Sequence, residues 1–129
     1  MLDGQGLAVS VENNTAVLAY NKAVTEWLDY KISSMRTLKR AIELEPDFCI
    51  AHCFRGYLFV TFNSAAVLPA AVASLTKARA LAGTASEREQ RHVAALRHLL
   101  EGAPHRACAC WDEITADYPH DILALRMHH

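Results

Sequence analysis

The sequence predicts an all-α protein: a right-handed solenoid of about three antiparallel helix pairs, followed by the start of a fourth. Three observations predict this fold class. Apolar residues recur with helical periodicity along most of the 129 residues, without the sustained alternation or Asn-Gly turns typical of β-hairpins. Proline, glycine and capping residues divide the chain at helix-length intervals. One spacing of small, large and apolar residues recurs in every second predicted helix.

The composition is that of one globular domain. The chain is 52% hydrophobic and 21% charged. A chain of this length buries roughly two-thirds of its unfolded surface, so folding needs no disulfide or metal. The 13 Lys and Arg residues against 14 Asp and Glu give a net charge of -1. Binders of nucleic acids and anionic membranes carry a basic surface that this balance lacks, so we expect neither nucleic acid nor membrane as a partner.

The first helix pair is predicted over roughly residues 13–46. Asn13 or Asn14 caps its first helix, whose apolar residues share one face: Val17, Tyr20, Val24, Trp27 and Leu28. The second helix carries its own apolar stripe: Ile32, Met35, Leu38 and Ile42. It ends at Glu45, because a proline at position 46 disfavours helical conformation in the residue before it.

The second pair is predicted over 47–83. Asp47 caps a helix over roughly 48–61. The next helix begins at Pro69, since proline is tolerated in the first turn but would cost about 3 kcal/mol inside a helix that began earlier. That helix runs to about Ala82, before Gly83.

An uncharged stretch between Arg55 and Lys77 is long enough to raise the question of a membrane span. Pro69 and the polar pair Asn63-Ser64 interrupt it, and small residues dilute its second half. Two buried helices joined by a loop at about 62–68 therefore explain it better.

The third pair is predicted over 84–119. Ser86 and Glu89 form a capping box, in which each side chain satisfies a backbone donor of the other residue. Gly102 ends this helix. The next runs over about 104–117 and stops before the Tyr-Pro dipeptide that follows it.

Residues 120–129 begin a fourth pair. Asp121 caps the helix, and apolar residues follow directly: Ile122, Leu123, Leu125 and Met127. Terminal repeats of a solenoid need polar outer faces, whereas this segment offers apolar surface and stops after about two turns. We expect the chain to be the N-terminal part of a longer protein and to self-associate through this unfinished repeat.

The repeated spacing places a small residue first, a large one four positions later, an apolar one three further on, and then a helix breaker. Its three copies are Ser34, Leu38, Ala41 and Pro46; Ala71, Leu75, Ala78 and Gly83; and Ala107, Trp111, Ile114 and Pro119. Two helices in slightly more than about 34 residues are typical of tetratricopeptide repeats. Gly56 and Ala95 supply the small residue at the close-packing point of the third and fifth helices. A non-repetitive helical bundle is the alternative.

A longer pattern extends this likeness. From position 88 onward it comprises Arg88-Glu89-Gln90, His92-Val93, Ala95, Gly102, Ala107-Cys108, Trp111, Ile114, Asp117, Pro119, Asp121 and Leu123-Ala124-Leu125; near the start it comprises Gly6-Leu7, Ser10, Asn13, Ala16 and Tyr20. The pattern resembles the N-terminal region of the tetratricopeptide repeat protein 38 family over nearly the whole chain. The resemblance implies an α-helical repeat protein without an established enzymatic activity, and it implies no catalytic residues.

Two clusters suggest metal ligands. Cys49, His52 and Cys53 lie within one helical turn and could offer two or three ligands to zinc, but a fourth must come from elsewhere. Glu89 and His92 have the Glu-x-x-His spacing of di-iron bundles, which need two such pairs and further carboxylates. We interpret the cysteines as small buried residues and expect no metal and no cofactor.

The cysteines give no sign of secretion or catalysis. Cys108 and Cys110 cannot bridge on one helix, and the N-terminus lacks the basic and apolar regions of a signal peptide. Reduced thiols fit a cytoplasmic protein. Either thiol could act as a nucleophile with His98 or His105, yet nothing marks a nucleophile elbow or an orienting acid. We expect no catalytic residues.

Helical repeats commonly act as scaffolds, and their first helices line a concave groove for a peptide or partner helix. The residues expected in such a groove are Ile50, Cys53, Tyr57, His92 and Leu96. Burial against another part of the same protein explains the same five residues, and we favour it slightly. The sequence therefore predicts a non-catalytic scaffold that binds an unknown protein or peptide, packs onto the rest of its own chain, or does both. The alternative is a metal-dependent or thiol enzyme using the Cys and His residues of the third, fifth and sixth helices.

Overall fold

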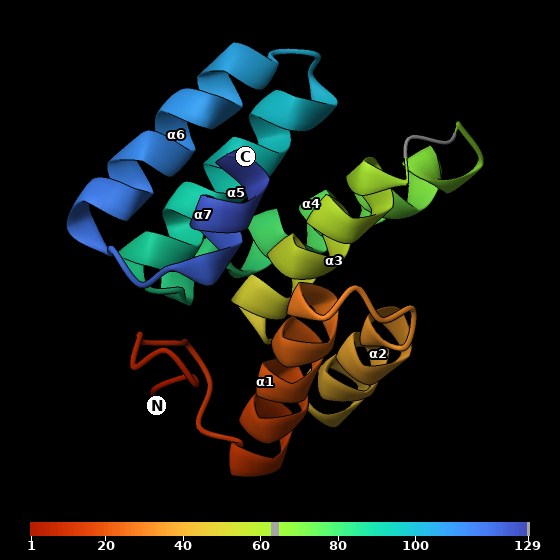
Figure 1. Ribbon diagram of the computed structural model, residues 1–129, viewed down its shortest axis with the longest axis vertical. Helices are drawn as coiled ribbons and strands as arrows, with labels where there is room; N and C mark the ends of the chain where they lie inside the picture. The colour runs from red at the N-terminus through yellow and green to blue at the C-terminus, as the bar shows by residue number, and fades with distance from the viewer. Residues whose placement is uncertain (63–64, 129) are drawn as a thin grey trace.

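The computed structural model describes residues 1–62 and 65–128, so part of the predicted loop and His129 lie outside the described residues. The described chain is all-helical, as predicted (Figure 1). Its helices are α1 (Asn14–Leu28), α2 (Ser34–Leu44), α3 (Cys49–Thr61), α4 (Leu68–Leu81), α5 (Glu87–Leu100), α6 (Pro104–Asp117) and α7 (Ile122–His128), with short 3-10 turns η1 (Ala65–Val67) and η2 (Ala82–Thr84). Residues 1–13 precede α1 as a non-helical segment, which we call the N-terminal segment.

Consecutive helices pack in pairs: α1 with α2, α3 with α4, and α5 with α6 (Figure 1). Helix α3 also packs against α5, and α7 packs against α6. At its far end α7 reaches α1, where the guanidinium of Arg126 lies 5.2 Å from the centroid of the Trp27 ring. The last described helix therefore contacts both the third pair and the first.

The repeated spacing coincides with the buried face of the second helix in every pair. The buried residues are Ser34, Leu38 and Ala41 in α2; Ala71, Ser74, Leu75 and Ala78 in α4; and Ala107, Trp111 and Ile114 in α6. Only Ser74 falls outside the predicted spacing. One packing register is thus used three times along the chain.

The first helices of neighbouring pairs are spaced in two different ways. At Gly56 of α3 an added Cβ would lie 2.5 Å from Cδ2 of Leu96 in α5, so the absent side chain is what allows these helices to approach. Between α1 and the second pair, rings fill the gap instead. The ring centroid of Tyr20 lies 5.1 Å from that of Phe48 and 6.0 Å from that of Phe54.

Most predicted helix boundaries are confirmed. The Asn13 side chain accepts a hydrogen bond from the Ala16 amide at 3.1 Å, and Ser86 and Glu89 form the expected capping box. Helix α6 has the predicted bounds. Helix α4 begins one residue before Pro69, which therefore sits in the first turn as expected.

Two expectations are wrong. Asp47 does not cap α3: Phe48 holds the N-cap position and makes no side-chain capping bond. The cap comes from another helix, because Oε2 of Glu89 accepts the Ile50 amide at 2.9 Å. Ile32 does not belong to the buried stripe of the second helix, because α2 begins only at Ser34 and leaves Ile32 95% exposed in the preceding turn.

The uncharged stretch forms α4 with its two flanking 3-10 turns. The run Ala65–Thr84 is 20 residues long and, by length and composition alone, apolar enough to cross a membrane, although only 22% of its most apolar window is buried. Leu68 and Val72 are exposed. Helix α4 packs against α3 as one member of a pair, so it is covered along one side instead of on all sides as a buried core helix would be.

Candidate functional site

The five residues predicted to line a concave groove are all in the interior. Ile50, Cys53, Tyr57, His92 and Leu96 are each 0% exposed. They form part of one continuous core, and no partner can touch them in this conformation. Their surroundings define the candidate site, which is a chain of buried polar contacts joining α3, α5, α6, α7 and the N-terminal segment.

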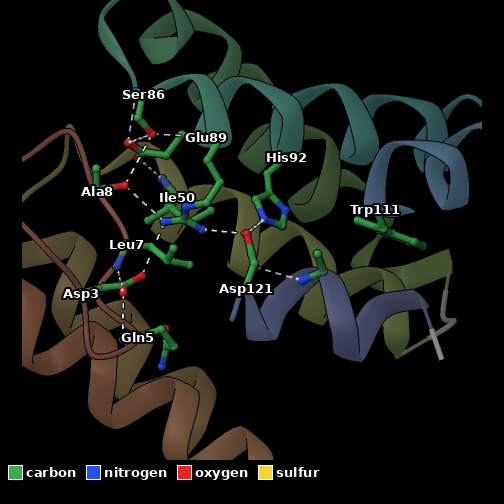
Figure 2. A network of polar contacts seen from close by, with 12 residues as sticks. Asp3, Gln5, Leu7, Ala8, Ile50, Ser86, Glu89, His92, Trp111 and Asp121 are labelled. Carbon is green, nitrogen blue, oxygen red and sulfur yellow. Dashed lines mark hydrogen bonds and ion pairs between the residues drawn. The ribbon is translucent and has the colours of Figure 1, made fainter. Parts of the chain in front are cut away.

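The centre of this chain is Asp121, the residue before α7. Its Oδ2 lies 2.8 Å from Nε2 of His92 (Figure 2). The same oxygen accepts a hydrogen bond from Nη1 of Arg88 at 3.0 Å. Its Oδ1 accepts the Ala124 amide at 3.1 Å, which confirms the predicted cap of α7. Asp121, Arg88 and His92 are all buried, so this short helix is attached to α5 by an ion pair with Arg88 and a hydrogen bond with His92, both away from water.

The second ring nitrogen of His92 continues the chain. The Tyr57 hydroxyl lies 2.8 Å from Nδ1 of His92 and 3.2 Å from its backbone carbonyl. Nε1 of Trp111 donates to the Tyr57 oxygen at 3.2 Å. The contacts therefore run from α7 through α5 to α3 and α6. We call these buried residues, together with Asp3, which contacts Arg88, the Asp121 network: Asp3, Arg88, His92, Asp121, Tyr57 and Trp111.

Electrostatics keep the network charged at one end and neutral at the other. Burial acts to raise the pKa of Asp121, but its interactions with His92 and Arg88 hold that pKa well below the usual range. Burial acts to lower the pKa of Arg88, but the charge and hydrogen bond of Asp121 together with the charge of Asp3 and the nearby Tyr20 raise it above the usual value. Burial raises the pKa of Tyr57 well above that of a free tyrosine. At neutral pH the carboxylate and guanidinium are thus an ion pair, and the phenol keeps its proton.

The N-terminal segment is fastened to the same arginine. Nη2 of Arg88 lies 3.5 Å from Oδ2 of Asp3 and donates to the Ala8 carbonyl at 3.3 Å. The other carboxylate oxygen of Asp3 accepts the Gln5 and Leu7 amides at 2.9 and 3.1 Å (Figure 2). Asp3 therefore folds the segment back on itself and pairs with α5 at once. Sequence reasoning missed this contact, because nothing near Asp3 in the sequence marks its partner.

Glu89 caps two helices. Its Oε1 accepts the Ser86 amide at 3.3 Å in the capping box of α5, and its Oε2 accepts the Ile50 amide of α3 at 2.9 Å. Ser10 of the N-terminal segment donates to the same Oε2 at 3.2 Å. Glu89 and His92, the predicted Glu-x-x-His pair, are thus directed to different partners and share no common point.

The Cys-His cluster on α3 is also divided. Nε2 of His52 lies 2.7 Å from the Pro46 carbonyl, and Sγ of Cys49 lies 3.7 Å from the Ala78 carbonyl. A hydrogen bond with Cys49, together with burial, raises the pKa of Cys53, which disfavours the thiolate that a metal or a nucleophilic reaction needs. Among residues 1–62 and 65–128, no three His, Cys, Asp or Glu side chains are placed to hold a metal ion.

Helix α6 carries the remaining thiols. Cys108 and Cys110 are half-buried, and burial raises the pKa of Cys110. Nδ1 of His98 is buried without a hydrogen-bond partner, and within the described chain no hydrogen bond joins either thiol to His98 or His105. The geometry therefore does not assemble the thiol–imidazole pair that nucleophilic chemistry requires.

The Asp121 network does not line three concavities of the described surface. These have volumes of about 280, 460 and 440 Å³, and none is lined by a residue of the network. The arrangement can therefore hold helices together, but it offers no reacting group to a ligand in this conformation. No family model matches the chain. No solved structure matches it either.

Proposed function

We propose that this protein is a non-catalytic scaffold of tetratricopeptide-like helical repeats that binds a protein or peptide. One observation carries the proposal: the same register of small, large and apolar residues is buried in α2, α4 and α6. Repeated helix pairs stack into extended surfaces, and such surfaces serve binding more readily than chemistry. The resemblance to the tetratricopeptide repeat protein 38 family and the near-neutral composition support a cytoplasmic protein without nucleic-acid or membrane partners.

The five predicted groove residues then have a structural role in this conformation. Ile50, Cys53, Tyr57, His92 and Leu96 are covered by the chain itself, which favours packing within the chain over an open concave groove. A peptide would reach them only after α7 and the N-terminal segment had moved away. Binding in the described conformation must use surface outside this set.

Self-association through α7 is part of the proposal. The helix buries Leu123 and Ala124 and leaves Leu125 40% exposed. An exposed leucine beside the half-buried Ile122 and Met127 offers a second copy, or a continuation of the repeats, an apolar edge to cover.

The alternative enzyme function is tested by metal analysis of protein purified without an affinity tag. The scaffold proposal expects no stoichiometric zinc or iron. Stoichiometric metal that is lost in Cys49→Ala or His92→Ala would overturn it.

Partner binding is tested by placing a photo-crosslinking amino acid, one position at a time, in the intact protein in cells. Suitable positions are Leu18, Ile32, Leu68 and Leu125, because each is an exposed apolar residue on a different element. We expect a discrete adduct with another protein from one face and not from the others. If no position gives an adduct above the level of the unmodified protein, the scaffold proposal is wrong.

A further inference from the structure

A groove of about 440 Å³ lies where the end of α1, the turn before α2, the end of α3 and α7 meet. Its wall is made mainly of aromatic and apolar side chains, namely Trp27, Tyr30, Ile32, Met35, Leu58 and Phe62. We call it the α1–α7 groove. Its volume is within the range of sites that hold one or two side chains of a partner or a small ligand.

Its rim exposes large side chains that folding does not bury. Ile32 is 95% exposed, Tyr30 83% and Phe62 55%. Scattered single apolar residues are normal on a protein surface, but three around one concavity form a patch of the kind found at interaction sites. Ile32 is also the residue that helical periodicity assigns to the buried stripe of the second helix.

The turn that carries this rim is held in an unusual conformation. Tyr30 has φ 59°, the left-handed region that bulky residues rarely adopt. The turn is fixed on both sides: the Lys31 amide donates to the Glu26 carbonyl at 2.8 Å, and the Glu26 carboxylate accepts hydrogen bonds from the hydroxyls of Ser33 and Thr37. The aromatic ring is therefore presented to solvent by a rigid support, and a rigid surface loses little freedom on binding.

The charged residues that line the groove are cations. Lys31 and Arg126 line it, and no acidic residue does so among the described residues; the Glu26 carboxylate, which interacts with Lys31, is held by Ser33 and Thr37 outside the lining. The guanidinium of Arg126 stacks 4.4 Å from the centroid of the Tyr30 ring, and neither it nor Lys31 forms an ion pair within the described chain. Two cations beside an apolar wall are complementary to an apolar group that carries a carboxylate.

We propose that the α1–α7 groove docks a partner peptide in which a large apolar residue lies next to an Asp or Glu. The apolar side chain packs against Trp27 and Phe62, and the carboxylate pairs with Arg126 and Lys31. The proposal rests on the scaffold function and names the chemistry of its partner. A second copy of this chain fits less well, because a symmetric contact through this groove would bring the two cations of one copy against those of the other.

A randomised peptide library displayed on phage tests this proposal with the intact chain as bait. We expect the selected peptides to be enriched in Asp or Glu beside Leu, Ile or Phe. A fluorescently labelled selected peptide then measures affinity for two charge-reversed proteins. Lys31→Glu/Arg126→Glu changes the groove, and Lys39→Glu/Arg40→Glu makes the same charge change on exposed residues of α2 outside it.

Binding weaker by about tenfold or more in the first variant, and changed by less than about twofold in the second, is the expected result. An equal loss of peptide affinity in both variants, or selected peptides without acidic residues, would overturn the proposal that Lys31 and Arg126 bind a carboxylate. A dimer in light scattering that Ile32→Asp dissociates would also overturn it, since a second copy would then occupy the groove. The crosslinking experiment separates these failures from that of the scaffold function: an adduct from another face, without one at Ile32, leaves the scaffold standing and removes only this site.

Discussion

Nε2 of His92 and Oδ2 of Asp121 lie 2.8 Å apart, and neither side chain contacts solvent. The two residues come from α5 and from the turn before α7, so this contact and the neighbouring ion pair with Arg88 decide where α7 lies. Because the carboxylate holds one imidazole nitrogen, the other is left for the hydroxyl of Tyr57. A single buried acid therefore orders four helices.

Asp121→Ala should lower the free energy of unfolding by about 3–5 kcal/mol, because it leaves a buried guanidinium with only its longer contacts to Asp3 and the Ala8 carbonyl. Urea titration followed by circular dichroism measures the change. Glu101→Ala is the matched control, since its ion pair with Arg97 spans 3.9 Å on the surface, and it should cost less than about 1 kcal/mol. Similar losses in both variants would contradict the role given to Asp121.

Stability should fall in acid partly through the same carboxyl. The pKa of Asp121 is lowered on folding, so its contribution is complete above the unfolded value of about 3.9 and is lost as the pH falls below it toward the folded pKa. The unfolding free energy measured between about pH 5 and pH 3 should therefore decline more steeply in the natural protein than in Asp121→Asn. If the unfolding free energy falls equally steeply with pH in both proteins, then the pKa of Asp121 does not differ between the folded and unfolded states.

Glu89→Ala should destabilise the protein by about 2–4 kcal/mol, because one substitution removes the cap of α3 and half of the capping box of α5, and leaves the buried Ile50 amide unpaired. Hydrogen exchange at the Ile50 amide should accelerate. Asp47→Ala provides the contrast. Sequence places Asp47 as the cap of α3, but its side chain caps nothing, so the change should stay within about 0.5 kcal/mol. A larger loss of stability in Asp47→Ala than in Glu89→Ala would mean that Asp47, and not Glu89, caps α3.

Gly56→Ala should cost about 1–3 kcal/mol through overpacking, since the added methyl would meet the Leu96 side chain at 2.5 Å. Leu96→Val in the same protein should recover part of the loss, and thermal unfolding of the two single variants and the double variant measures that coupling. Gly83→Ala is the control, because its added methyl meets nothing within 4 Å. Additive effects at Gly56 and Leu96 would mean that the helices simply move apart.

Self-association should appear in light scattering as a mass above that of the 14.3 kDa monomer at micromolar concentration. Leu125→Asp should restore the monomer by placing a charge on the exposed edge of α7. If the natural protein is a monomer across the micromolar range, the proposal that a second copy covers the apolar edge of α7 is contradicted.

The local features of the fold were predictable from the sequence. Asn13, the capping box at Ser86 and the prolines act on backbone within a few residues, so their effects are visible in the sequence. The spacing Ser34, Leu38 and Ala41 is visible because one helix face repeats its packing. Asp47 shows what local sequence cannot reveal. It is a good local cap for α3, yet the Ile50 amide is accepted by the carboxylate of Glu89, which lies 39 residues further along the chain.

The site was less predictable for the same physical reason. The sequence predicts His92 and Tyr57 as site residues but not the partners around them, since Arg88 contacts Asp121 across 33 residues and Asp3 across 85. Sequence periodicity does not predict contacts between residues this far apart in the chain. Ile32 has the sequence spacing of the buried stripe of the second helix, but it is not part of that helix. The turn held by Glu26 precedes α2, which therefore begins only at Ser34.

The contacts of Arg88 also impose an order on biosynthesis. As the chain leaves the ribosome, the first two helix pairs can assemble before Asp121 is synthesised. Until then Arg88 has only Asp3 and the Ala8 carbonyl as partners from the earlier part of its network. The docking of α7 thus comes after the first two helix pairs have formed, and slow or interrupted translation between Arg88 and Asp121 would leave the Arg88 guanidinium exposed to chaperones and proteases without the carboxylate that pairs with it.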